Sequence, residues 1–246
     1  MTFEAQLDAW LADAEHRHLA DLRFPEVSRA LRALSATYVE RRSRIGEGGA
    51  LSGQGKRAAF ALFYAPLHAL MARHIASTQP RRRTALLVDL GCGTGAAGAA
   101  WAAALDPRPE VLGIDRHPWA VEEARLTYRA FGLRARTRVE DLARTTFPAG
   151  SHVVAGWAVN EIADEARHAL LERLLSHAAR GGQVTVIEPL AGFVAPWWAS
   201  WRERVETAGG RADEWRIRVP LPPIVAKLDR AAGLNHREIT ARSLAL

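Results

Sequence analysis

The stretch VDLGCGTGAAG, residues 88–98, has the composition of a ligand-binding loop. An apolar run over 85–90 ends at Gly91, and small residues follow Gly95. Glycines permit a tight turn that brings backbone N–H groups close to a ligand and points the N-terminus of the next helix toward it. We therefore expect a strand, a loop and a helix, with a ligand held over the loop.

The glycines fit two patterns. Gly91, Gly93 and Gly95 form G-x-G-x-G, whereas Gly93, Gly95 and Gly98 form G-x-G-x-x-G, the fingerprint of dinucleotide binding. Asp89, two residues before the first glycine, discriminates between them. A carboxylate repels a pyrophosphate but suits the ammonium and sulfonium of S-adenosylmethionine (SAM), so the sequence favours SAM.

Further acidic residues follow the next two predicted strands. Asp115 ends the second strand, where an acid binds ribose hydroxyls in both kinds of site. Glu140, Asp141 and Leu142 end the third strand, and an acid there can accept a hydrogen bond from an adenine amino group. The chain ends after one late predicted strand, which leaves no second domain for a dehydrogenase.

The order of the predicted elements indicates a doubly wound, Rossmann-like α/β fold with a parallel sheet. We expect residues 1–83 to form a helical N-terminal extension and lid, with Phe63 and Tyr64 facing the pocket, and residues 84–246 to form the ligand-binding domain. Apolar periodicity predicts helices over 3–42, 56–75, 95–105, 118–132, 165–182, 196–210 and 222–233, and strands over 85–90, 110–115, 134–142, 152–159, 183–190 and 236–246.

The ordered set DLGCGTG, GID, the acid after the third strand, and VNEI resembles the class I SAM-dependent methyltransferases over roughly residues 84–246. VVAGWAVNEI followed by GGQVTVIEPL also resembles, over a shorter stretch, the methyltransferase-like family associated with the small ribosomal subunit. Mitochondrial members of that family are associated with a cysteine-bound iron–sulfur cluster. Cys92 is the only cysteine of this chain, so that feature does not carry over.

The resemblance implies a SAM cofactor and a set of residues that hold it. Its methionine and ribose parts would lie against the loop, and its ribose hydroxyls on Asp115. Its adenine would meet Asp141 and the Leu142 backbone, with either Arg116 or His117 over the adenine face. The full set expected at the cofactor is Asp89, Gly91, Cys92, Gly93, Gly95, Asp115, Arg116, Asp141, Leu142 and Trp157.

Methyl transfer needs few fixed side chains, because the enzyme mainly aligns the acceptor with the methyl group and excludes water. Asn160 and Glu161 follow the fourth strand at the usual ligand position. They are candidate catalytic residues, with Asn160 orienting an acceptor N–H or O–H and Glu161 accepting a proton or pairing with a cation. Alternatively, they cap and begin the next helix.

Three aromatic residues are candidates for substrate binding. Trp197 and Trp201 share a predicted helix face after the fifth strand, and Tyr64 belongs to the expected lid. The two tryptophans could stack on an aromatic or nucleobase acceptor, with Arg202 and Arg204 on phosphates. An ordinary buried helix with a basic outer face also explains them. We expect no metal site, and we interpret His68, His74 and His152 as core or surface residues.

The net charge of +6 is concentrated in one segment. Residues 41–83 hold nine Lys and Arg against Glu47 alone, including RRSR at 41–44 and RRR at 81–83. This charge predicts an anionic partner, with ribosomal RNA or the small ribosomal subunit as the first hypothesis. The single cysteine and the absence of a signal peptide or a spanning segment favour a cytoplasmic protein that does not enter membranes.

The sequence thus predicts a SAM-dependent methyltransferase that acts on an N or O acceptor, with RNA favoured. A small-molecule methyltransferase and a SAM-binding ribosome-assembly factor with little turnover remain open. The oligomeric state does not follow from the sequence.

Overall fold

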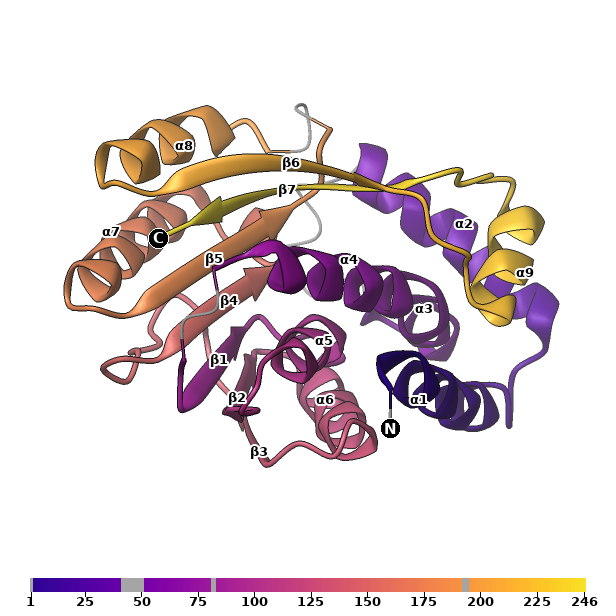
Figure 1. The fold of residues 1–246 in the computed structure, drawn as a ribbon. Coiled ribbons are helices and arrows are strands. Elements are labelled where there is room, and N and C mark those ends of the chain that lie inside the picture. Colours follow the sequence, from indigo (N-terminus) through magenta and orange to yellow (C-terminus); the bar gives the residue numbers. More distant parts are fainter. Residues whose placement is uncertain (1, 41–50, 81–82, 192–194) are drawn as a thin grey trace.

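The computed structural model describes residues 2–40, 51–80, 83–191 and 195–246. Its centre is a seven-stranded sheet in the order β3-β2-β1-β4-β5-β7-β6 (Figure 1). The strands are β1 (Leu86–Leu90), β2 (Glu110–Asp115), β3 (Ala135–Val139), β4 (His152–Gly156), β5 (Gln183–Glu188), β6 (Arg211–Ile217) and β7 (Ile239–Ala245). The strand order reverses between β1 and β4, which places a crevice at their carboxyl ends.

Helices cover both faces of the sheet, as expected for a doubly wound fold (Figure 1). On one face, α7 (Asp164–Ala179) and α8 (Trp198–Thr207) pack over one set of alternating strand residues. On the other face lie α4 (Ala65–Thr78), α5 (Ala96–Ala104) and α6 (Pro118–Ala130). Successive strand residues point to opposite faces, so Val88 and Leu87 enter different cores. The prediction of a Rossmann-like α/β fold is confirmed.

The remaining helices gather at the carboxyl ends of the strands. They are α1 (Phe3–His18), α2 (Phe24–Glu40), α3 (Gln54–Ala59), the π-helix η3 (Phe60–Tyr64) and α9 (Pro223–Ala232). Figure 1 shows α2 and α9 side by side at this end, and α9 also packs on η3. Helices from both ends of the chain therefore cover the crevice.

The helix predicted over 56–75 is continuous but contains a wide turn. Pro66 has no N–H to donate to Leu62, its partner in a regular α-helix. At this point the Ala65 N–H donates to the Phe60 carbonyl, five residues earlier. Such π-turns often occur at functional sites. Here the turn lies in the part of the helix that faces the crevice.

Three predictions about the strands need correction. The strand β6, which the sequence analysis missed, carries four charged residues in RADEWRI because it is a largely exposed edge strand. The sheet is not wholly parallel, since β7 runs antiparallel between β5 and β6. The fourth strand ends at Gly156 rather than 159, because Trp157 has a φ of 56° and turns the backbone out of the sheet.

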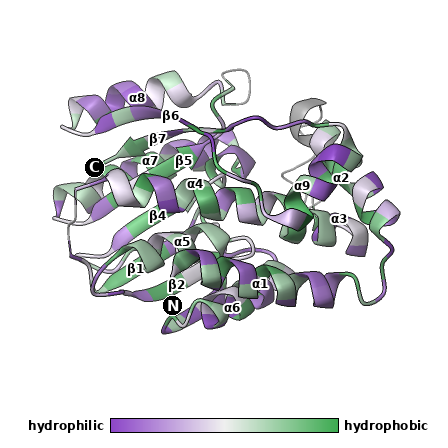
Figure 2. Ribbon diagram, turned by 45° about the vertical axis from the view of Figure 1, so that its right-hand side comes forward, coloured by the Kyte–Doolittle hydropathy of each residue, from purple (hydrophilic) through white to green (hydrophobic). Residues whose placement is uncertain are grey.

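Hydropathy follows this arrangement. Figure 2 shows the hydrophobic colours on the central strands and purple along much of the visible surface of α8. Trp101, Tyr128 and Phe63 are among the largest fully buried side chains. No helix among the described residues is both long and apolar enough to cross a bilayer.

Candidate functional site

The glycine loop follows β1 and begins α5, as predicted. Gly91 and Cys92 donate their N–H groups to the Ile114 carbonyl at 2.8 and 2.9 Å, so the loop is anchored to β2. Gly91, Gly93 and Gly95 have φ values of 69°, 52° and 77°, in the left-handed region that favours glycine. The three glycines are therefore required by the backbone conformation.

The surroundings of these glycines differ. A Cβ on Gly91 would lie 2.3 Å from the Ala158 Cβ, and one on Gly95 would lie 2.9 Å from the Ala124 Cα. Packing therefore also requires glycine at both positions. A Cβ on Gly93 would meet nothing nearer than 3.6 Å, where Phe60 faces it. Gly93 thus leaves open space above the loop.

That space belongs to a cavity of about 570 Å³, a volume typical of ligand sites. It lies at the carboxyl ends of the parallel strands, and its walls come from distant parts of the chain. The N-terminal helices contribute Leu51, Phe60, Tyr64, Leu67 and His68, and the β7 end contributes His236, Glu238, Ile239 and Thr240. The strand ends between them contribute, among others, Gly91, Cys92, Gly93, Asp115, Arg116, His117, Asp141, Leu142, Trp157, Asn160, Glu161 and Glu188.

Asp115 lies at the end of β2, where the sequence placed it. Its two carboxylate oxygens accept hydrogen bonds from the Gly93 and His117 N–H groups, both at 2.9 Å. These bonds fix the carboxylate beside the loop and leave further acceptor positions on each oxygen. Asp115 is therefore held in place at the cavity wall with acceptor positions available to a ligand.

The next residues along this wall can contact a heterocyclic ring. The His117 Nδ1 is buried and has no hydrogen-bond partner among the described residues. An unpaired buried nitrogen is costly, so a polar ligand atom at this place would stabilise the site. Asp141 accepts the Ala143 N–H at 2.9 Å through one carboxylate oxygen, which orders the loop after β3.

Asp89 does not line the cavity. Its side chain is 1% exposed beneath the loop, where Tyr128 Oη donates to it at 2.7 Å. Burial raises the pKa of Asp89 to about 7, against the lowering effect of hydrogen bonds from Tyr128 and the Gly98 backbone. The structure thus makes Asp89 a support of the loop rather than a direct partner of a cationic ligand. Gly95, also expected at the cofactor, faces α6 instead.

An aromatic wall faces the loop from the N-terminal helix. Phe60, Tyr64 and His68 are spaced by four residues, so they share one helix face. The His68 ring stacks on Trp157 with a centroid distance of 3.8 Å and an interplanar angle of 3°. Desolvation lowers the pKa of His68 to about 3, so this ring is neutral near neutral pH. Phe63, also expected to face the pocket, is instead fully buried.

Trp157 has an unusual backbone for this position. Its φ of 56° is rare in a bulky residue, and its N–H donates to Ile187 at 2.7 Å. Strain of this kind persists where the surrounding structure enforces it, commonly at ligand sites. It places the indole in the cavity wall beside His68.

Asn160 is part of a hydrogen-bond network between β5 and α8. The Asn160 Nδ2 donates to Glu188 at 2.5 Å, and its Oδ1 accepts from the Trp197 Nε1 at 2.9 Å. Glu188 also accepts the N–H groups of Val159 and Asn160. Burial raises the pKa of Glu188 to about 8, against those hydrogen bonds and the nearby Arg242. Asn160 therefore fixes the loop after β4.

Glu161 does not lie in the first turn of α7, which begins at Asp164. The N-cap residue of that helix is Ala163, which offers no side-chain hydrogen bond. Its carboxylate lines the cavity, with the Arg116 guanidinium 4.0 Å away. Burial together with the charge of Asp115 raises the pKa of Glu161 to about 7, and Arg116 acts in the opposite direction. Glu161 is thus an ionisable group facing the ligand space.

The tryptophans of α8 are placed differently from the sequence hypothesis. Trp197 and Trp201 contact each other at 4.7 Å between ring centroids, and neither lines the cavity. Trp201 is 4% exposed, and Trp197 is tied to Asn160. Both belong to the packing between α8 and the sheet. Substrate stacking on them is not supported by this placement.

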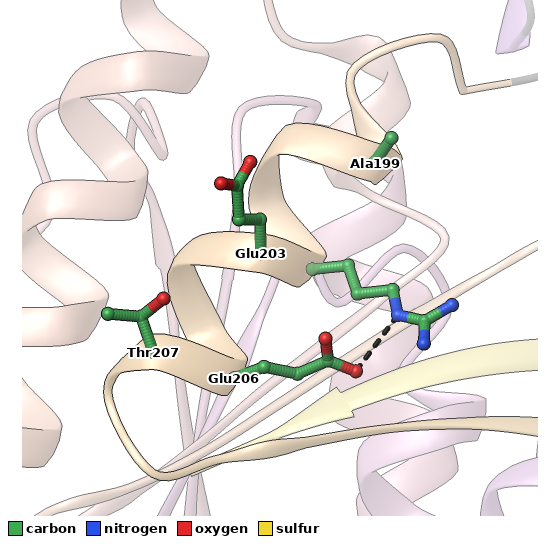
Figure 3. A pocket seen from close by; sticks show the side chains of 5 residues that line it. Ala199, Glu203, Glu206 and Thr207 are labelled. Atoms are coloured by element: carbon green, nitrogen blue, oxygen red, sulfur yellow. Dashed lines mark hydrogen bonds and ion pairs between the residues drawn. The ribbon is translucent and has the colours of Figure 1, made fainter.

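A second, shallow hollow lies on the outer surface of α8 (Figure 3). It is lined by Ala199, Arg202, Glu203, Glu206 and Thr207. Arg202 pairs with Glu206 at 2.9 Å within the helix, and Arg204 pairs with Glu172 at 2.8 Å. Both arginines are therefore charge-compensated on an open surface, which does not make a phosphate site.

Most Lys and Arg residues of the segment 41–83 fall outside the residues that the structure describes. RRSR at 41–44 and the first two arginines of 81–83 fall outside the described residues. Within the cavity the charge has the opposite sign. Among the described residues, its walls carry five carboxylates and a single arginine, namely Asp115, Asp141, Glu161, Glu188, Glu238 and Arg116.

The structure therefore gathers most of the predicted site in one cavity. Gly91, Cys92, Gly93, Asp115, Arg116, Asp141, Leu142, Trp157, Asn160, Glu161 and Tyr64 line it, whereas Asp89, Gly95, Trp197 and Trp201 do not. His68, Glu188 and His236 also line the cavity, and their places there were not predicted from the sequence. A carboxylate at the end of an otherwise apolar strand was a readable signal for Glu188, but the two histidines came from segments with no motif. No set of three His, Cys, Asp or Glu residues suitable for a metal occurs in the described part of the chain.

Comparison with known proteins identifies the central part of the chain. Residues 87–182 match the family model described as a methyltransferase domain. Among curated proteins, none matches the sequence significantly.

Two solved structures share the fold at low sequence identity. A protein from Nostoc punctiforme assigned as an O-methyltransferase superposes with a TM-score of 0.56 at 15% identity, covering 90% of this chain and 72% of the other. The mitomycin 7-O-methyltransferase MmcR gives a TM-score of 0.53 at 17% identity, covering 100% of this chain and 75% of its own. Residues 87–182 thus resemble a methyltransferase domain, and the chain shares the Rossmann-like fold of these two structures.

Proposed function

We propose that this protein transfers a methyl group from SAM to an oxygen or nitrogen atom of a small acceptor molecule. The observation that carries the proposal is the cavity itself. Within a methyltransferase domain, it joins the open glycine loop, the fixed carboxylate of Asp115 and the unpaired nitrogen of His117 on one continuous wall. These groups match the polar parts of SAM.

The residues that would hold SAM form the cofactor half of the cavity, which we define as Gly91, Cys92, Gly93, Asp115, Arg116, His117, Asp141 and Leu142. Asp115 would accept the ribose hydroxyls, and Asp141 with Leu142 would meet the adenine. Glu161 would pair with a cationic group of the cofactor. SAM supplies an electrophilic methyl group bonded to a positively charged sulfur.

The protein's own contribution is to position the acceptor and to exclude water. The acceptor half, which we define as Phe60, Tyr64, His68, Glu188, His236, Glu238 and Thr240, brings together three segments that are remote in sequence. The helix over 54–78 covers the loop, with Phe60 above Gly93. Such a cover aligns reactants and keeps water from the reacting atoms.

The cavity walls favour a small acceptor over RNA. Even with Glu161 and Glu188 partly protonated, the acidic groups of the described walls outnumber the one arginine, and this disfavours a phosphate-rich ligand because like charges repel in a partly desolvated site. Phe60, Tyr64 and the His68–Trp157 stack favour an uncharged, apolar acceptor instead. The hypothesis of RNA or ribosomal binding rests on the +8 charge of residues 41–83, and the Lys and Arg residues of this segment that the structure describes do not line the cavity.

The test is methyl transfer from radiolabelled SAM into separated small-molecule, RNA, protein and ribosomal fractions of a cell extract. We expect label in the small-molecule fraction. Label found only in the RNA fraction would show that the acceptor is RNA and would contradict a small-molecule acceptor. Binding of SAM with no label in any fraction, together with copurification with small ribosomal subunits, would instead favour an assembly factor.

A further inference from the structure

His236 and Asp229 form a pair at the edge of the cavity that no sequence motif indicates. The His236 Nδ1 lies 2.5 Å from the Asp229 Oδ1, and the His236 N–H donates to the Asp229 Oδ2 at 2.9 Å. Asp229 is 4% exposed on α9, whereas the His236 side chain is 36% exposed and lines the cavity. The buried carboxylate of Asp229 thus contacts both the ring and the backbone N–H of His236, and it fixes an imidazole that is accessible from the cavity.

The pairing determines the chemistry of the ring. An ionised carboxylate only accepts hydrogen bonds, so the His236 Nδ1 must carry a proton. In the neutral ring, the second nitrogen, Nε2, then has a free lone pair. A carboxylate that fixes this tautomer and stabilises the cation formed later is the arrangement of a general base and its orienting acid.

The other groups near His236 do not replace it in this role. Glu238, two residues on, is paired with Arg216 at 3.1 Å and Arg218 at 3.9 Å on the β6 side. From η3, the Phe63 ring lies 5.7 Å from the imidazole and cannot titrate. The remaining ionisable groups of the cavity, among the described residues, are Tyr64, His68, Cys92, Arg116, His117, Asp115, Asp141, Glu161 and Glu188.

The charge of the walls shows why the acceptor needs a base. A preformed oxyanion would enter a cavity whose acidic groups, in the described part of the chain, outnumber its one arginine even when Glu161 and Glu188 are protonated, so a hydroxyl acceptor binds better in its neutral form. A neutral hydroxyl must lose its proton as it attacks. Aromatic side chains line the acceptor half, which suits a planar phenol.

We propose that His236, oriented by Asp229, is the general base that deprotonates a phenolic acceptor. The proton of the phenol passes to the His236 Nε2, and the oxygen electron pair forms the new bond to the methyl carbon. The carbon–sulfur electron pair remains on sulfur, which loses its positive charge. This inference rests on the proposed function and specifies its acceptor class.

The experiment compares two phenols of similar size, 4-methylphenol, which stays protonated near neutral pH, and 4-nitrophenol, which loses its proton readily. The variants are His236→Gln and Asp229→Asn, with the exposed His168→Gln on α7 as the matched control. We expect His236→Gln to lower kcat for 4-methylphenol by about 100-fold or more. The loss for 4-nitrophenol should be less than about tenfold, since it needs little help from a base. Asp229→Asn should follow the same pattern more weakly, and His168→Gln should change neither rate.

Two further measurements keep the outcome interpretable. Calorimetric binding of S-adenosylhomocysteine (SAH) to each variant tests the cofactor half, and its failure in the wild type would overturn the proposed function itself. Nitrogen-15 NMR of the full chain should show the neutral His236 ring protonated at Nδ1, and a mixture of tautomers in Asp229→Asn.

Equal losses with both phenols in His236→Gln, or a wild-type ring protonated at Nε2, would overturn the role of His236 as a base. If SAH binds but neither phenol is methylated, the assignment of a phenolic acceptor is wrong.

Discussion

The cofactor half and the acceptor half of the cavity are built in different ways. The cofactor half comes from the carboxyl ends of β1, β2 and β3 and the residues directly after them, within residues 91–142. The acceptor half joins residues 60–68, the end of β5 and the connection from α9 to β7. One half is assembled from consecutive units, whereas the other depends on contacts between the two ends of the chain.

This difference explains what a change in each half would do. The cofactor half depends on backbone conformation, because its glycines and its bound carboxylate leave little freedom for other residues. Apart from Glu188 and Thr240 on β5 and β7, the acceptor half consists of side chains on helices and loops, so most of its lining can change without loss of the fold. We expect substitutions in the first to affect folding and cofactor binding, and those in the second to affect acceptor turnover.

The largest effect is expected for Gly91→Val. Its Cβ would lie 2.3 Å from the Ala158 Cβ at a φ of 69°, so the loop and the segment after β4 cannot keep their positions. We expect destabilisation of about 4 kcal/mol or more, or failure to fold, measured by denaturant unfolding. The matched control is Gly132→Ala, at a similar φ of 64° with nothing within 4 Å, which should cost only about 1–2 kcal/mol. Equal effects of the two would show that packing against Ala158 is unimportant.

A smaller effect, on ligand binding alone, is expected for Glu161→Gln. Loss of the carboxylate facing the cavity should weaken SAM binding about tenfold above neutral pH. Since the pKa of Glu161 is raised to about 7, the wild type should approach the variant as the pH falls to 6. Calorimetry at the two pH values, with the exposed Glu165→Gln as control, measures this. If the difference in SAM affinity between the wild type and Glu161→Gln does not change with pH, the Glu161 carboxylate does not pair with a cationic group of SAM.

A pH effect of comparable size arises from buried carboxyl groups. Burial raises the pKa of Glu188 to about 8 and that of Asp89 to about 7. Above the ordinary carboxyl pKa of about 4, the unfolded chain releases these protons, whereas the folded state retains them up to about pH 7 on Asp89 and about pH 8 on Glu188. The free energy of unfolding should therefore fall as pH rises through this range. Each group contributes up to about 1.4 kcal/mol per pH unit within its window. Urea unfolding of the wild type and Glu188→Gln should show a shallower slope in the variant, and a steeper slope would contradict the raised pKa.

The smallest effect is expected for Trp197→Phe. It removes the hydrogen bond to Asn160 at 2.9 Å and keeps most of the ring packing. We expect a loss of about 1 kcal/mol in unfolding free energy, with SAM binding unchanged. A large loss of acceptor turnover with unchanged stability would instead indicate that Trp197 contacts the substrate.

The same contrast separates what the sequence could predict from what it could not. Asp115 and the glycine loop were readable because their spacing follows from consecutive strand–helix units. Asp89 was placed at the ligand because the sequence does not reveal that Tyr128, 39 residues later, binds its carboxylate from below. His68 and His236 carry no local pattern, and only the tertiary fold brings them to one cavity.

The edge strand β6 was missed for a related physical reason. Its charged residues are tolerated because only β7 pairs with it and most of its side chains are exposed or half-buried. Similarly, the predicted end of β4 was placed three residues too late, at 159, because Trp157-Ala158-Val159 is apolar. Apolar residues do not reveal that the backbone turns at a positive φ.

The most direct test of the central claim is calorimetric titration of the wild type and Asp115→Ala with SAM, SAH and NAD. We expect SAM and SAH to bind the wild type and NAD not to bind, since Glu161 in the cavity wall suits the positive charge that SAM carries. Asp115→Ala should weaken both SAM and SAH by about 1–3 kcal/mol, because it removes charged hydrogen bonds to the ribose. Tight binding of NAD with none of SAM would contradict the account.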